Sequence, residues 1–260
     1  MPKLLEFRCA VVVIDVGDEI GKAIARYFVS QNKKVLIAGR IESQLQSTTR
    51  EVGAYAYYVV DMGSTTDIMA FVKEIIRDHP ELDCIVNNAN VQRPLQALHW
   101  LRCKDEFLAK ADAEIDIQVR GPMCLTMELV SHLQTKKAPV ILNVFIVLGY
   151  LPFAFINPIY VSTKAWLHHW TMSLRTQLQL ERSPIRVVEV APPEVNFHHG
   201  FLQKASTNAE STVNWYPLTV EDFMRELVKL LEADGEEMLF IGPSATLPSF
   251  WLSNSTNQNE

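Results

Sequence analysis

The chain has 260 residues, of which 48% are hydrophobic and 21% charged, a composition that suits one globular α/β domain with a large core. Its net charge of −6 and its lack of a basic block exclude nucleic acid and an anionic membrane surface as partners. No apolar run has the length of a signal-peptide core or a bilayer span, and Cys9, Cys84, Cys103 and Cys124 lack the paired spacing of a metal site, so we expect a cytoplasmic protein without a metal.

Short apolar runs alternate along the chain with amphipathic stretches of helix length, which predicts βαβ units and a parallel sheet. The predicted strands are Cys9–Ile14, Lys34–Ala38, Tyr55–Val60, Asp83–Val86, Pro139–Val144, Arg186–Val190 and Met238–Ile241. The predicted helices are Ile20–Ser30, Glu42–Glu51, Thr65–Asp78, Ala113–Gln134, Ile159–Leu180 and Val220–Glu232. No composition break marks a second domain, so residues 1–243 are expected to form one domain, with 196–217 as a substrate lid and 244–260 as a C-terminal tail.

Four sequence blocks, in this order, resemble the short-chain dehydrogenase/reductase superfamily, and together they extend over nearly the whole chain. They are Val11–Ala25, Leu82–Asn90, Asn143–Lys164 and Val187–Val195. The segments Tyr160–Ala165 and Ser173–Arg175 most resemble the branch that contains the bacterial D-alanine-esterification oxidoreductase. The resemblance implies an α/β Rossmann-type fold, doubly wound in three layers, whose seven parallel strands have the order 3-2-1-4-5-6-7. It also implies a homodimer or homotetramer.

The turn after the first strand departs from this superfamily. Where the family has Thr-Gly-x-x-x-Gly-x-Gly, this chain has the segment Ile14–Gly21, in which Asp15 and Glu19 replace the two glycines that serve the cofactor. Asp18 adds a third carboxylate at the helix N-terminus, where it is placed to act as the cap. A register that uses Gly17 and Gly21 would restore two glycines but would shorten the segment before the second strand by two residues. Two like charges about 4 Å apart repel by about 4 kcal/mol at an effective dielectric of about 20.

Other positions that the family uses for its cofactor have two interpretations. Arg40 stands where NADP-preferring relatives hold the 2′-phosphate, but it is also an ordinary surface arginine, and Asp61 is either an adenine contact or a turn residue. Asn90 replaces a glycine after Asn88, and Phe197 replaces a threonine. We interpret the remaining cofactor positions as vestiges, so that no cofactor is expected. They are Gly17, Gly21, Arg40, Asp61 and Asn88.

The catalytic positions of the family are partly kept. Tyr160 and Lys164 are four residues apart, so they share one helix face, and a neighbouring ammonium favours the phenolate needed for acid/base work. The family's asparagine is Gln118. Its serine is absent, because Asn143-Val144 is followed by Phe145, Ile146 and Val147. His168, one turn after Lys164, is interpreted as an interior or interface histidine.

These departures predict a cofactor-independent isomerase, cyclase or dehydratase that acts on a small, largely apolar molecule. Tyr160, supported by Lys164, would move the proton, and Gln118 would orient groups. The residues expected to line the substrate pocket are Phe145, Ile146, Phe153, Phe155, Phe197, His198 and His199. One alternative is an NADP-dependent short-chain reductase of a carbonyl substrate. The other is a non-catalytic pseudoenzyme that binds a ligand or a partner.

Overall fold

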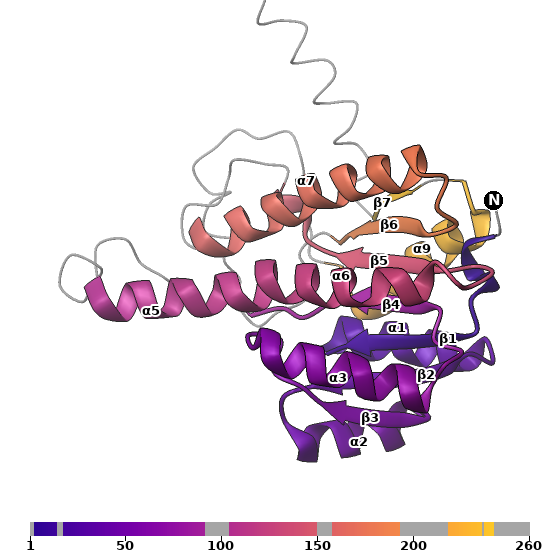
Figure 1. The fold of residues 1–260 in the computed structure, drawn as a ribbon, viewed down its shortest axis with the longest axis horizontal. Helices are drawn as coiled ribbons and strands as arrows, with labels where there is room; N and C mark the ends of the chain where they lie inside the picture. Colours follow the sequence, from indigo (N-terminus) through magenta and orange to yellow (C-terminus); the bar gives the residue numbers. More distant parts are fainter. Residues whose placement is uncertain are drawn as a thin grey trace, which may run out of the picture.

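The sheet has the strand order that the resemblance implies. The computed structural model describes residues 3–14, 18–91, 104–149, 158–192, 218–235 and 237–241. Its seven parallel strands lie in the order β3-β2-β1-β4-β5-β6-β7 (Figure 1). They are β1 Cys9–Val13, β2 Lys34–Gly39, β3 Ala56–Val59, β4 Cys84–Asn87, β5 Val140–Val144, β6 Arg186–Ala191 and β7 Met238–Phe240. The predicted Rossmann-type fold is confirmed, with strand ends that differ by at most one residue from those predicted.

Helices cover both faces of the sheet, which gives three layers (Figure 1). The α-helices are α1 Glu19–Ser30, α2 Glu42–Val52, α3 Thr65–Asp78, α5 Lys104–Ile115, α6 Gly121–Leu133, α7 Pro158–Leu180 and α9 Val220–Ala233. Short 3-10 turns are η1 Leu4–Glu6 and η3 Val147–Gly149, and η2 Asp116–Arg120 is a π-helical turn. No helix within the described ranges is long and apolar enough to span a bilayer.

Two apolar cores, one on each face, follow from the alternation of side chains along the strands. Val12 of β1 packs with Phe28 of α1 and Phe223 of α9 on one face. Val11, its neighbour in β1, packs on the other face with residues of α3, α6 and α7. A strand buried on both faces has no polar alternation, and for this reason the apolar run at residues 10–14 identified β1 correctly.

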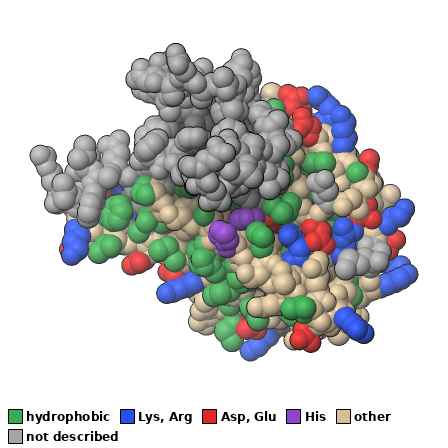
Figure 2. All heavy atoms as spheres, turned by 90° about the horizontal axis from the view of Figure 1, so that it is seen from above, with side chains coloured by type: hydrophobic (Ala, Val, Ile, Leu, Met, Phe, Trp, Pro, Cys, Tyr) green, Lys and Arg blue, Asp and Glu red, His purple; other side chains and the backbone are tan. Residues whose placement is uncertain are grey.

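Acidic and basic side chains are interspersed over the described part of the surface in Figure 2.

The predicted helix Ala113–Gln134 is wrong in its extent and in its continuity. The helical segment already begins at Lys104, and the π-turn η2 separates α5 from α6. In α5 only Ala111 and Glu114 are buried, so its apolar periodicity is too weak to mark a helix start. The first residue of α6 is Gly121. A side chain is not tolerated at this position, because a Cβ atom there would lie 2.5 Å from the Met62 carbonyl oxygen. The lid at 196–217 and the tail at 244–260 lie outside the described residues, and these boundaries stay predictions.

Candidate active site

The N-terminus of α1 holds a carboxylate where the family binds phosphate. Asp18 is the N-cap of α1, and its Oδ1 accepts a hydrogen bond of 2.8 Å from the Gly21 backbone N–H. The Asn88 side-chain amide donates to the other Asp18 oxygen and, at 3.1 Å, to the Val13 carbonyl. An anionic cap satisfies free N–H groups and is favoured by the helix dipole. Asp18 is only 8% exposed. It is the helix cap that the sequence predicts, and through Asn88 it also links the start of α1 to the end of β1.

Two glycines allow the chain to pack closely beside this cap. A Cβ atom on Gly21 would lie 2.4 Å from an Asp18 oxygen and 2.6 Å from the Asn88 amide nitrogen, and one on Gly39 would lie 2.6 Å from the Ile14 carbonyl oxygen. Both positions therefore require bare backbone, which is the packing role expected of Gly21. Gly17, like Asp15, lies outside the described residues.

An open groove of about 210 Å³ lies between α1 and α2 at the end of β2. Arg40, Lys22, Ser47 and Thr48 line it, and they offer the cationic and hydroxyl donors that a phosphate monoester requires. Lys22 also pairs with Glu19 at 3.0 Å. Asp61 has an exposed side chain whose Oδ1 accepts a hydrogen bond from the Gly63 N–H at 2.8 Å, which is the turn role.

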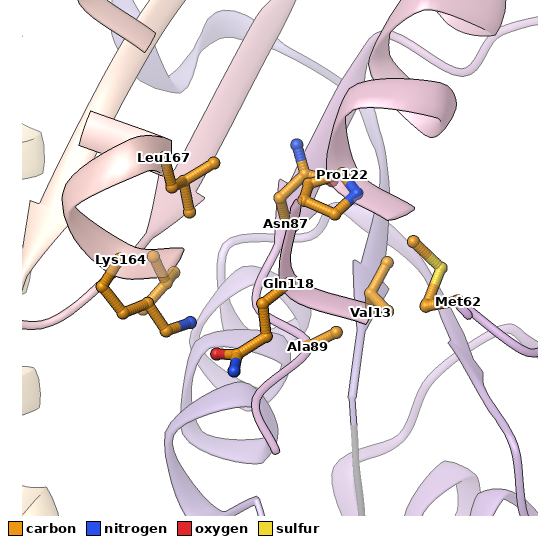
Figure 3. Close-up of a pocket in the computed structure, with 9 residues that line it drawn as sticks. Val13, Met62, Asn87, Ala89, Gln118, Pro122, Lys164 and Leu167 are labelled. Atoms are coloured by element: carbon orange, nitrogen blue, oxygen red, sulfur yellow. The ribbon is translucent and has the colours of Figure 1, made fainter. Parts of the chain in front are cut away.

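Tyr160 and Lys164 lie together in the interior. They are 4% and 2% exposed, and the Lys164 Nζ atom lies 5.6 Å from the centre of the Tyr160 ring. Lys164 borders a narrow cleft of about 10 Å³, which is space for about one water molecule. The cleft is lined by Val13, Met62, Asn87, Ala89, Gln118, Pro122, Val144, Lys164 and Leu167. Figure 3 shows the Lys164 and Gln118 side chains extending into the same space from α7 and η2.

Two buried amide oxygens next to this cleft have no hydrogen-bond partner among the described residues. Gln118 donates from Nε2 to the Val91 carbonyl at 2.9 Å, and its Oε1 has no partner. Asn87 donates from Nδ2 to Asn143 Oδ1 at 2.8 Å, and its own Oδ1 has no partner. Buried acceptors are normally satisfied, so these oxygens mark places for water or for polar groups of a ligand.

The Lys164 ammonium is subject to opposing influences. Burial lowers its pKa to about 8, while the negative charges of Asp18 and Glu114 counter this by favouring the protonated form. Glu114 is fully buried at the end of α5. It was not among the site residues predicted from the sequence. A usable signal was present, because Ala111, Glu114 and Gln118 have the i, i+3, i+7 spacing of one helix face.

Of the predicted pocket residues, the structure describes Phe145 and Ile146, and neither lines this cleft. Phe145 is buried and its ring is stacked on His168 at 5.9 Å, while Val144 and Leu167 line the cleft instead. His168 Nδ1 lies 3.2 Å from both carboxylate oxygens of Glu189, so it is a paired interior histidine, as interpreted. Ile146, at the family's serine position, is half-buried. Phe153, Phe155, Phe197, His198 and His199 lie outside the described residues.

Comparisons with known proteins now identify the family. The family model described as short chain dehydrogenase matches residues 9–207. The uncharacterized oxidoreductase DltE of Bacillus subtilis is 27% identical over 68% of this chain and 68% of its own length. The NADP-dependent 3-hydroxy acid dehydrogenase YdfG of Escherichia coli is 26% identical over 82% of this chain and 84% of its own. A short chain dehydrogenase/reductase from Burkholderia phymatum, solved with NAD, has the same fold, with a TM-score of 0.78 at 16% identity over 98% of this chain and 95% of that one.

These relatives overturn the expectation of a cofactor-independent isomerase, cyclase or dehydratase, and with it the expectation of no cofactor. They are oxidoreductases, and one of them is named as NADP-dependent. Carboxylates at the phosphate turn affect one part of a cofactor site, whereas Arg40, Tyr160 and Lys164 keep the family's residue types at three other positions. The match over residues 9–207 shows that this chain belongs to the short-chain dehydrogenase family.

Proposed function

We propose that this protein is an NADP-dependent oxidoreductase that interconverts a carbonyl and a hydroxyl group of a small molecule. The observation that carries the proposal is the buried pair of Tyr160 and Lys164 on one face of α7, with Lys164 bordering a cleft at the carboxyl ends of β1, β4 and β5. Ligands of open α/β sheets bind at this edge. Membership of the family and the NADP-dependent relative support the redox reaction.

Tyr160 is the acid/base group of this proposal. Its phenol donates a proton to the carbonyl oxygen during reduction, and its phenolate accepts the hydroxyl proton during oxidation. The Lys164 ammonium near its ring stabilises the phenolate. Since Ile146 stands at the serine position and has no hydroxyl, substrate polarisation depends on Tyr160 more than it does in a family member with that serine.

The described residues offer suitable chemical groups for NADP at the two ends of the site. In the groove after β2, Arg40 would hold the 2′-phosphate, assisted by the hydroxyls of Ser47 and Thr48. At the other end, the reactive part of the cofactor would lie against Lys164 and Gln118, where the described residues leave space for about one water molecule. When bound, NADP supplies or accepts the hydride. Asp18 opposes the phosphates between these ends by charge, so we propose that binding is weaker than with a neutral cap.

The test is a calorimetric titration with NADPH and NADH, followed by turnover assays on 3-hydroxy acids, sugars and aldehydes. We expect NADPH to bind in the micromolar range, and Tyr160→Phe to abolish turnover without changing that affinity. Tyr55→Phe is the matched control, because Tyr55 is 67% exposed and the substitution keeps its ring. Absence of binding by either nucleotide, or full turnover by Tyr160→Phe, would overturn the proposal.

A further inference from the structure

Glu114 is a charged residue in a position that normally disfavours one. The helix α5 projects beyond the carboxyl ends of the strands (Figure 1), and Glu114 lies in its last turn, before η2. Of the twelve residues of α5, only Ala111 and Glu114 are buried, and Glu114 is 0% exposed. Burial of a carboxylate is strongly unfavourable unless a cation or several donors compensate it. This requirement points to a specific electrostatic role for the side chain.

The other buried charges of the described residues have local partners of their own. They form three groups, namely Asp83 with the backbone N–H groups of Arg8 and Cys9, Arg186 with Asp234, and Glu189 with His168. Lys164, Asp18 and Glu114 are buried as well, and Asp18 also accepts hydrogen bonds from Gly21 and Asn88. The electrostatic interactions of Lys164 are with these same two carboxylates. The charges of Glu114 and Asp18 therefore both act on the buried Lys164 ammonium.

The packing of the helices explains why the charge of Glu114 acts on Lys164. Glu114 and Gln118 are four residues apart, and Gln118 borders the same cleft as Lys164. Both α5 and η2 pack against α7, the helix that carries Lys164. The buried face of α5 and η2 is therefore the face turned to Lys164. Asp18 approaches the lysine from a different element, the N-terminus of α1.

We propose that Glu114 is a positioning residue that, together with Asp18, keeps Lys164 protonated beside Tyr160. The role rests on the proposed function, because Lys164 matters there through the Tyr160 phenolate. The titratable groups that face Lys164 from the described elements are Asp18 from α1, Glu114 from α5 and Tyr160 from α7 itself. Burial alone would deprotonate Lys164 at a lower pH, and each carboxylate opposes this effect.

The test begins with the protein free of nucleotide, so that it is independent of turnover. Lys164 is assigned in ¹⁵N-lysine-labelled protein by comparison with Lys164→Met, and its pKa is followed by NMR in wild type and in Glu114→Gln. We expect Glu114→Gln to lower this pKa by about one pH unit, and Glu114→Asp to restore most of it. Asp112→Asn is the matched control, since Asp112 is an exposed acid of the same helix. An unchanged lysine pKa in Glu114→Gln would overturn the inference.

Turnover supplies a second readout. If the Lys164 pKa falls from about 8 to about 7, the protonated fraction at pH 8 falls about fivefold, and we expect kcat to fall by that factor with KM unchanged. Should Glu114→Gln fail to fold, the wild type still decides, because the ¹³C signal of the Glu114 carboxyl group should change as Lys164 titrates. A flat carboxyl signal across that titration would contradict the inference. If NADPH does not bind, the proposed function is wrong, but the measured effect of Glu114→Gln on the Lys164 pKa is not affected.

Discussion

The Asp18 carboxylate and the Gly21 backbone N–H are joined by a 2.8 Å hydrogen bond across the first turn of α1. This bond uses the helix end that would otherwise attract a phosphate, and it leaves a negative charge beside it. Asp18 therefore gives α1 a stable start and weakens the binding of an anion at the same place.

Replacing Asp18 by serine should tighten the binding of NADPH. Serine is also a good N-cap, so the helix start is kept while the opposing charge is removed. We expect about a tenfold lower Kd in calorimetry, which corresponds to about 1.4 kcal/mol. The control is Asp67→Ser, a change in the first turn of α3 at an exposed site. An unchanged or weaker affinity of Asp18→Ser would show that the carboxylate does not oppose the nucleotide.

Arg40 should distinguish NADPH from NADH. It lines the groove after β2 with the Ser47 and Thr48 hydroxyls, and a charge-assisted hydrogen bond to a phosphate contributes about 1.5–3 kcal/mol. Arg40→Gln is expected to raise the Kd for NADPH between about tenfold and a hundredfold and to leave that for NADH unchanged. Arg50→Gln, an exposed arginine of α2, serves as the control. Equal losses for both nucleotides would place the 2′-phosphate elsewhere.

The fold was predictable because its signal is local and repeated. Apolar runs such as Ala10–Ile14 identify strands buried on both faces, and their alternation with amphipathic helices leaves few topologies. The pair of Tyr160 and Lys164 was predictable from the family resemblance, and their spacing of four residues on a helix predicts one shared face. Long-range contacts carry no such signal. Gln118 donates to Val91, and Phe145 packs on His168, through pairings that only the folded chain brings together.

The functional prediction failed because it treated a local electrostatic cost as decisive. Carboxylates at Asp15, Asp18 and Glu19 lower the affinity for a phosphate, but affinity depends on the whole site, including Arg40. Glu114 was missed for a related reason. The spacing of Ala111, Glu114 and Gln118 indicates a shared helix face, but only the packing of α5 against α7 shows that this face is turned to Lys164.

Loss of the Glu189 carboxylate should destabilise the fold without touching the cleft. Its two oxygens lie 3.2 Å from His168 Nδ1, and it is 1% exposed. Glu189→Ala removes the partner of a buried imidazole, which costs about 2 kcal/mol and lowers Tm by about 4–8 °C. Scanning calorimetry measures the change, with the exposed Glu181→Ala as control. A Tm equal to that of wild type would mean that the pair contributes nothing to stability.

The pH dependence of kcat/KM should report the Lys164 ammonium. Burial lowers its pKa to about 8, so the group is charged below that pH and loses its proton above it. Because the charged form stabilises the Tyr160 phenolate, kcat/KM is expected to fall as the pH rises through about 8. Lys164→Arg keeps its charge throughout this range, since the guanidinium pKa is above about 12, so its residual activity should show no such fall. The exposed Lys73→Arg is the control. If Lys164→Arg shows the same decline near pH 8 as wild type, the titrating group is not the lysine.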